Sequence, residues 1–528
     1  MRNQIRFAFI LSLALSAQLL HAQSYRETGA FALTNVRIEI GDGRVIEKGT
    51  VLLRDGMIQA VGKEVAIPAG TEIVKGDGMT VYPGFTDCLN SGGLMLPPFQ
   101  PVQDVPPDTS AFAPPYMREA NRKGVRPELR ASEYFALNDG FLSPLRKEGG
   151  FTTAMILPSG GTIAGSGALI NLSGKPKRES VLKNDTGIGF SFSSDGESGG
   201  GTGYPGSLLG IIAHLRQTLF DAQRYPLQLA SYAKHGGPRP PVDDTLQALQ
   251  PVLSGSQTVF FTASNENEVV RALNLSKEFH FKLFIAGGQE AYKQAPLLAK
   301  EGVPVIVSLN FGEDPAEKGK KKEDPPKDAT KPADKNDKAT EKPVDKSEPA
   351  KPVLKEDDPK KQDDAKPEVK KADDKKPDEK KPDAKKIEDE LDEVAPKAVA
   401  AHLHEEWLKK VNNAAVLSKS GVQIAFSSKD GKGAGEFWKG LRQAMKSGLP
   451  KQKALEALTI NPAKMFRLEK SLGTIEVGKI ANLVVMSGDF SDDKSKFKML
   501  FIDKTKFDLE EEAPASAPVS RRRPREIE

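Results

Sequence analysis

Two hydrophobic patterns divide the chain into a strand-rich beginning and a longer region of alternating strands and helices. Residues 31–82 form short runs of alternating apolar and polar side chains, separated by glycine-containing turns such as Arg-Asp-Gly-Met at 54–57. This pattern predicts antiparallel strands joined by tight turns. From residue 136 onward, nearly continuous apolar runs alternate with stretches whose apolar residues recur at helical spacing. The second pattern predicts an α/β fold with buried parallel strands.

The clearest strand-and-helix repeats lie between residues 258 and 309. Apolar runs at 258–262, 282–286 and 304–309 predict strands, and amphipathic stretches at 266–280 and 290–301 predict the helices between them. The same patterns predict a strand at 152–157, helices at 207–223 and 402–420, and a strand at 421–426.

A charged segment interrupts these repeats at residues 313–397. It consists largely of Lys, Asp, Glu and Pro, with few large apolar side chains, and its opposite charges nearly cancel. Such a composition buries too little apolar surface to offset the entropy lost on ordering, about 1–2 kcal/mol per residue. We therefore expect a disordered insertion at 313–397, and a second disordered segment in the tail at 510–528.

The first 22 residues have the features of a secretory signal peptide. Arg2 and Arg6 precede an apolar run at 7–20, and Ala22 is a small residue at the expected cleavage position. We therefore expect an exported protein, periplasmic or extracellular, with no transmembrane span after cleavage. A retained membrane anchor is the alternative interpretation.

Charge and cysteine content narrow the possibilities further. The chain has 76 Lys and Arg against 72 Asp and Glu, a net charge of +4, which gives no reason to expect a nucleic-acid partner. Cys88 is the only cysteine, so no intrachain disulfide can form in spite of the predicted export. An ordinary packed core must stabilise the mature protein.

Three segments resemble the amidohydrolase superfamily. Residues 81–91 (Val-Tyr-Pro-Gly-Phe-Thr-Asp-Cys-Leu-Asn-Ser) resemble the family's P-G-F-I-D-x-H-x-H segment, which enters the barrel. Residues 457–466 are similar to its A-x-T-x-N-P-A stretch, and residues 473–485 to its returning strands. The resemblance covers nearly the whole mature chain outside the insertion and tail. The segments at 87–90, 134–135, 167–169 and 204–207 resemble exported, imidazolonepropionase-like proteins that lack the strand-1 histidine pair.

The resemblance implies a fold and an activity. The fold is a (β/α)₈ TIM-type barrel over 83–312 and 398–469, with a small β-sandwich built from both chain ends, 25–82 and 470–509. The implied activity is hydrolysis of a non-peptide C–N bond by water bound to a divalent metal such as zinc. The family's metal ligands are histidines on strands 1, 5 and 6 and an aspartate on strand 8.

This chain has other residues at those positions. Leu89 and Ser91 replace the strand-1 histidines, Thr262 stands at the strand-5 position, and strand 6 is followed by glycines. On strand 8 the family's aspartate is replaced by Lys429, with Asp430 one place later. We therefore predict that the chain has no metal cofactor. The candidate residues at the barrel mouth are Asp87, Ser91, Thr262, Lys429 and Asp430.

Strand geometry gives a further expectation for the first barrel strand. Alternation predicts that Asp87, Leu89 and Ser91 share one face and that Cys88 and Asn90 share the other. Cys88 is then a packing residue rather than a nucleophile.

Three functions stay open at this point. The first is an active hydrolase of non-peptide C–N bonds, as the resemblance implies. The second is a catalytically inactive barrel that binds a small polar ligand. The third is an inactive partner subunit of an active amidohydrolase paralogue.

Overall fold

The computed structural model describes residues 29–97, 124–193, 207–318, 399–429 and 433–509. The chain forms two compact units, one of Met1–Gly312 with Glu405–Glu528 and the other of Glu313–His404. The predicted signal peptide, nearly all of the predicted insertion, the predicted tail and Asp430 lie outside the described residues. No helix in the described ranges is long and apolar enough to cross a membrane.

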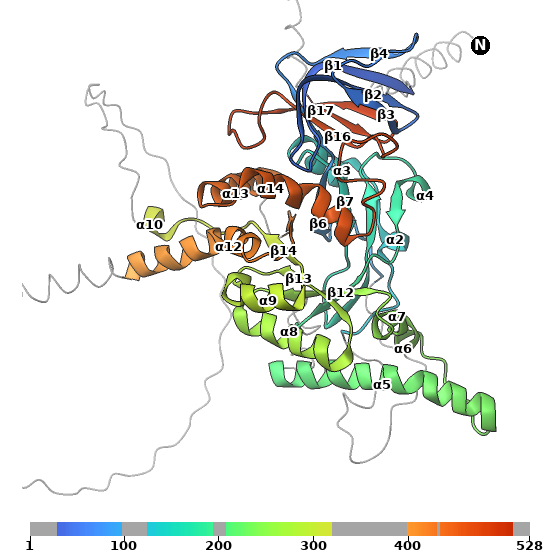
Figure 1. The fold of residues 1–528 in the computed structure, drawn as a ribbon. Coiled ribbons are helices and arrows are strands. Elements are labelled where there is room, and N and C mark those ends of the chain that lie inside the picture. The colour runs from blue at the N-terminus through green and yellow to red at the C-terminus, as the bar shows by residue number, and fades with distance from the viewer. Residues whose placement is uncertain (1–28, 98–123, 194–206, 319–398, 430–432, 510–528) are drawn as a thin grey trace, which may run out of the picture. The chain divides into compact units, whose positions relative to one another are not determined.

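An eight-stranded sheet is built from both ends of the larger unit (Figure 1). Its strand order is β18-β17-β16-β5-β1-β2-β3, and β4 pairs with β1. The antiparallel pair β5–β16, with Tyr82 opposite Val484, joins the N-terminal strands to the C-terminal ones. The strands are β1 (Ala30–Glu39), β2 (Val45–Arg54), β3 (Met57–Gly62), β4 (Glu72–Lys75), β5 (Thr80–Pro83), β16 (Leu483–Met486), β17 (Phe497–Ile502) and β18 (Thr505–Asp508).

This sheet curves around its own core. Phe31 on β1 and Phe501 on β17 contact each other with ring centroids 5.3 Å apart, although β5 and β16 lie between these strands. The Ile58 amide also donates to the carbonyl of Lys479 at 2.8 Å. The strands thus form one curved sheet, and the β-sandwich expected from the sequence is not confirmed.

Two further sheets carry the strand-and-helix repeats. One has the order β10-β9-β7-β6 and the other β15-β14-β13-β12-β11-β8, in which β11 to β15 are parallel. The predicted mixed α/β fold is therefore confirmed. The strands are β6 (Phe85–Asn90), β7 (Phe151–Ile156), β8 (Ile163–Ser166), β9 (Ala168–Asn171), β10 (Val181–Lys183), β11 (Ile188–Ser191), β12 (Thr258–Ala263), β13 (Lys282–Gly287), β14 (Val305–Ser308) and β15 (Ile424–Ser427).

The edges of these two sheets approach each other in two places. Only Gly167 separates β8, in one sheet, from β9, in the other. At the opposite ends, the Ser427 hydroxyl on β15 donates to the carbonyl of Leu89 on β6 at 2.7 Å. Among the described residues, the backbone pairing does not run around a single closed sheet.

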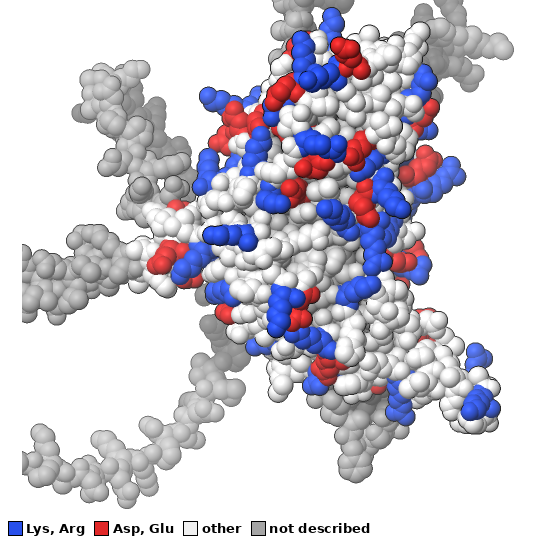
Figure 2. Space-filling model, in the orientation of Figure 1, with Lys and Arg blue, Asp and Glu red and all other residues white. Residues whose placement is uncertain are grey.

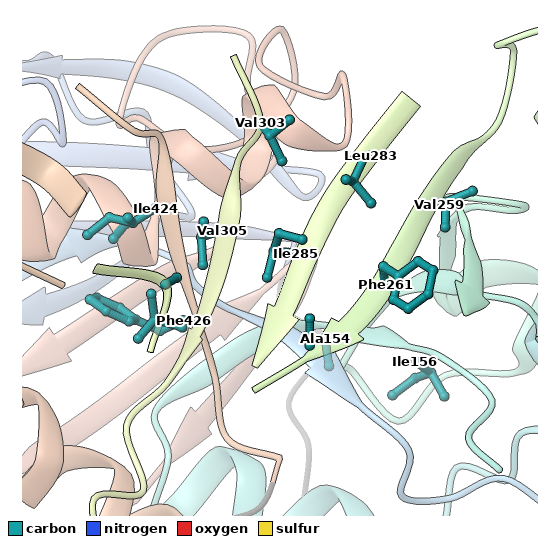
Figure 3. Packing of buried hydrophobic residues seen from close by; sticks show 14 of the residues in the cluster. Ala154, Ile156, Val259, Phe261, Leu283, Ile285, Val303, Val305, Ile424 and Phe426 are labelled. Carbon is teal, nitrogen blue, oxygen red and sulfur yellow. The ribbon is translucent and has the colours of Figure 1, made fainter. Parts of the chain in front are cut away.

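Both faces of these strands are buried, as their continuous apolar runs predict. Val259 and Phe261, Ile285, and Val305 face the helices in one cluster (Figure 3). The residues next to them in sequence belong to a second cluster, on the opposite face of the strands. That inner cluster contains Cys88, Leu89, Met155, Leu157, Leu169, Phe260, Ala286, Ile306, Ala425, Ala463, Met465, Phe466 and Leu472.

Helices cover the outer face of these strands (Figure 1). α8 (Glu266–Phe279) packs on β12 and β13, and it begins with a capping box formed by Asn265 and Glu268. Other helices are α2 (Ala131–Tyr134), α3 (Asp139–Lys147), α4 (Lys177–Ser180), α6 (Asp244–Ala248), α7 (Gln250–Leu253), η4 (Ala291–Gln294), α9 (Ala295–Glu301), α12 (Asn413–Lys419), α13 (Ala434–Lys446), α14 (Lys451–Leu458) and α15 (Ile460–Met465).

One helix is longer than the sequence predicts. α5 (Leu208–His235) continues past residue 223 through Pro226 and ends at Gly236. The proline removes one backbone donor, but the residues after it, Leu-Gln-Leu-Ala-Ser-Tyr-Ala-Lys, are mostly compatible with a helix.

The smaller unit is described only near its two ends. α10 (Pro315–Lys318) lies at the first end, and His404 lies at the second. The His404 Nδ1 atom is 2.6 Å from a carboxylate oxygen of Asp314.

Candidate functional site

A buried carboxylate lies where β6 meets β15. Asp87 is fully buried, and its Oδ1 atom accepts a hydrogen bond from the Ser428 amide at 2.9 Å. Its Oδ2 atom accepts from the Asn90 side-chain amide at 2.9 Å and from the Ser428 hydroxyl. We call Asp87, Asn90 and Ser428 the β6–β15 clasp, because their hydrogen bonds join the ends of these two strands.

Burial governs the ionisation of this carboxylate. Loss of water raises the pKa of Asp87 above its ordinary value, and the hydrogen bonds from Ser428 and Asn90 offset only part of that rise. The four donated bonds, including a longer one of 3.4 Å from the Leu89 amide, occupy both carboxylate oxygens. Both oxygens of the Asp87 carboxylate are thus hydrogen-bonded to other groups of the same protein.

The end of β6 does not keep the predicted alternation of faces. Asp87 pairs with Ala154 and Asn90 pairs with Ile156, so three steps along β6 match two along β7. Because of this register shift, Cys88 and Leu89 both join the inner apolar cluster. The expectation that Leu89 shares the face of Asp87, opposite Cys88, is therefore wrong.

The other candidate residues lie at different places in the fold. Ser91 follows β6 and is half-buried, and Thr262 is exposed at the end of β12. Lys429 follows the clasp residue Ser428, and its amide donates to the Ser427 hydroxyl at 3.0 Å. Asp430 lies outside the described residues. Of the candidates that the structure describes, Asp87 and Lys429 lie near each other in the fold, on either side of Ser428.

The residues at the strand ends do not fit a divalent metal. In the sheet register Thr262 lies beside Ala286, which lies beside Ile306, which lies beside Ala425. No group of three or more His, Cys, Asp or Glu side chains in the described ranges could hold a metal ion. A structural or catalytic zinc site needs at least three nitrogen, sulfur or carboxylate ligands.

No histidine belongs to the strands β12, β13, β14 or β15, whose ends are described above. His214 is on α5, His280 follows α8 in a left-handed conformation, and His404 contacts Asp314.

A cleft opens beside the clasp. It lies between the segment after β14, the end of β15 and α13, and its roughly 420 Å³ of non-atom space is partly open to solvent. Its polar lining includes Asn310, Ser428, Lys429 and Gln443, and Glu436 and Lys439 pair at 3.8 Å on its rim. The other lining residues are Leu309, Phe311, Gly312, Ser427, Phe437 and Gly440.

The sequence alone did not identify Asn310 as a residue of the cleft, or Ser428 as a residue of both the cleft and the clasp. Both follow the carboxyl ends of buried strands, where α/β barrels carry their functional side chains, and that position was the available signal. The sequence motif drew attention to Lys429 and Asp430 instead, because they stand nearest to the family's strand-8 aspartate.

Comparison with known proteins agrees with this architecture. Residues 398–508, which include β15, α13 to α15 and β16 to β18, match the model of the amidohydrolase family. This segment is therefore similar to the amidohydrolase family. No curated protein matches the chain.

Solved structures extend the likeness to most of the chain. An amidohydrolase from Thermotoga maritima MSB8 superposes with a TM-score of 0.62 at 22% sequence identity, covering 90% of this chain and 100% of that one. A Xaa-Pro dipeptidase with bound methionine gives a TM-score of 0.46 at 14% identity, covering 91% and 100%. The first likeness shows that most of the chain shares its fold with that solved structure.

Proposed function

We propose that this chain is an amidohydrolase-superfamily protein that has lost metal-dependent hydrolysis and binds a small polar ligand. The observation that carries the proposal is the β6–β15 clasp. By resemblance, the family's metal ligands include residues of strand 1 and strand 8, which correspond to β6 and β15. In this chain, hydrogen bonds among Asp87, Asn90 and Ser428 link these two strand ends instead.

The proposal includes the finer features that the resemblance implies. The two α/β sheets are taken as parts of one (β/α)₈ barrel, which is supported by the approach of β8 to β9 and of β15 to β6. The chain is also taken to belong to the exported, imidazolonepropionase-like subgroup, on the motif at 81–91 and the signal-like residues 1–22.

The cleft supplies the binding chemistry. Lys429 offers a cation, and Asn310 and Gln443 offer both donors and acceptors, so the lining suits a small ligand with a carboxylate or amide group. Ser428 connects this lining to the clasp, since its side chain also contacts Asp87. A bound ligand would therefore rest against a rigid wall.

A thermal-shift screen of small carboxylates and amides on the full chain tests the ligand site. A binder present at about 100 times its Kd should raise the unfolding free energy by about 2.7 kcal/mol. Lys429→Ala and Asn310→Ala should each reduce that shift, whereas Lys419→Ala, which changes an exposed lysine on α12, should leave it unchanged. A stabilising shift that survives both cleft substitutions contradicts the assignment of the site.

Hydrolysis of a non-peptide C–N bond is the second candidate function. The match of residues 398–508 to the amidohydrolase family favours it. Turnover of an amide or imidazolone substrate by the purified chain, lost on Asp87→Asn, would support it.

The partner-subunit function is a variant of the main proposal. It predicts that the chain co-purifies with an amidohydrolase paralogue that carries an intact strand-1 H-x-H.

A further inference from the structure

A second hollow lies in the larger unit, apart from the cleft beside the clasp. It is bounded by the end of α3, one face of α13 and the strand β17, and we call it the α13 groove. The groove contains about 1260 Å³ of open space. Its lining residues are Lys147, Glu148, Gly435, Trp438, Arg442, Ser495, Lys496, Phe497, Lys498 and Leu509.

The charge of the α13 groove is strongly positive. Its lining has four cationic side chains and one acidic one, Glu148, which gives a formal charge of +3. Nearby, Asp493 lies 3.4 Å from both Arg442 and Lys446, so this carboxylate is shared between two cations. Within the described ranges, no ion pair involves Lys147 or Lys496. Such an excess of positive charge in a hollow favours an anionic occupant.

This concentration of charge is not a property of the whole surface. On the face drawn in Figure 2, Lys and Arg lie intermixed with Asp and Glu. The net charge of +4 for the complete chain is also small, so a local charge of +3 in one groove is a distinct feature.

Of the two aromatic side chains that line the groove, Trp438 exposes little of its ring. Trp438 is buried, its indole N–H donates to the carbonyl of Gly149 at 3.1 Å, and its ring packs 5.3 Å from that of Phe497. A flat ring in a ligand would therefore find little of Trp438 to stack on. The groove is built to recognise charge on an extended ligand.

The chain itself supplies an acidic segment at this place. Leu509 lines the groove and is hydrogen-bonded to it, because its amide donates to the carbonyl of Lys498 at 2.9 Å. The next three residues in the sequence are Glu510, Glu511 and Glu512. Three residues span at most about 10 Å, so chain length alone keeps this run within about 10 Å of Leu509.

We infer that the α13 groove is a binding surface for an acidic polypeptide segment, and that its occupant is the run of glutamates at 510–512 of the same chain. Each exposed ion pair is individually weak. The covalent link at Leu509 makes the binding intramolecular, and a short tether gives an effective concentration in the millimolar range. Several weak pairs are then sufficient for occupancy. The inference is independent of the ligand proposed for the cleft.

Competition with a fluorescent hexaglutamate peptide tests this inference, with fluorescence anisotropy on the full chain at low ionic strength. The variant Glu511→Gln/Glu512→Gln should bind the peptide about threefold or more tightly than the wild type, because the internal competitor is weakened. The matched control, Glu526→Gln/Glu528→Gln, also removes two negative charges from the tail and should bind like the wild type. Lys147→Gln/Lys496→Gln, added to the first variant, should abolish the gain.

Three results would overturn the inference. An equal gain of affinity in the two glutamate variants would indicate a general charge effect. A gain that survives the lysine substitutions would locate the peptide elsewhere. A wild-type affinity that falls as protein concentration rises would make a second copy of the chain the source of the competing segment.

Discussion

Asp87 has the most constrained surroundings of the candidate residues. Its carboxylate is fully buried and accepts hydrogen bonds from β6 and β15, and it sits beside the apolar cluster that contains Leu89. Burial raises the pKa of Asp87, since the loss of water destabilises the charged form more than the neutral form. The hydrogen bonds therefore offset part of the desolvation cost, which an exposed carboxylate would not have.

This pKa shift predicts how stability changes with pH. A raised pKa means that the folded state binds the proton more tightly than the unfolded state, so the Asp87 contribution is fully present below the ordinary carboxyl pKa of about 3.8 and is lost as pH rises through the folded pKa. The free energy of unfolding of the wild type minus that of Asp87→Asn should therefore fall as the pH rises above 3.8.

Urea unfolding across this pH range measures the difference. Asp77→Asn, which removes an exposed carboxylate in a turn, is the control for the loss of one negative charge. A difference that instead grows with pH would mean that the clasp stabilises ionised Asp87 enough to lower its pKa.

At the scale of elements, the position of α13 depends on one close approach. A Cβ atom added to Gly440 would lie 2.2 Å from the Leu309 carbonyl oxygen, in the segment after β14. A Cβ atom added to Gly435 on the same helix would have no heavy atom within 4 Å. Since Leu309 and Gly440 both line the cleft, this approach sets the width of the cleft.

The two glycines provide a matched pair of substitutions. Gly440→Ala should lower the free energy of unfolding by about 1–3 kcal/mol, because backbone must move to relieve the clash. Gly435→Ala should leave it unchanged or raise it by about 0.5 kcal/mol, because alanine favours a helix. Chemical denaturation measures both, and equal effects would contradict the described packing of α13 on Leu309.

The sequence predicted elements best where local patterns decide the structure. The strands at 258–262, 282–286 and 304–309 correspond to β12, β13 and β14, because each is a continuous apolar run buried on both faces. The end of β6 was not predictable in this way. Its register shift depends on the partner strand β7, and no local pattern in residues 85–90 records it.

Features that depend on distant contacts are not recorded in local sequence patterns. A single curved sheet and a two-layer sandwich have the same local strand pattern, so residues 31–82 could not distinguish them. Asp87 was predictable as a candidate from its motif, but its partner Ser428 is 341 residues away in the chain. Asn310 follows a buried strand without any motif of its own, so only the fold reveals that it lines the cleft.

For the molecule as a whole, the central claim is that an amidohydrolase fold persists here without the family's metal centre. The most direct test is the metal content of the full chain, purified without a histidine tag and measured by mass spectrometry with and without added zinc. We expect far less than one bound metal ion per chain in both preparations. Near-stoichiometric metal would contradict it and would point to a ligand set that includes Asp430 or His402.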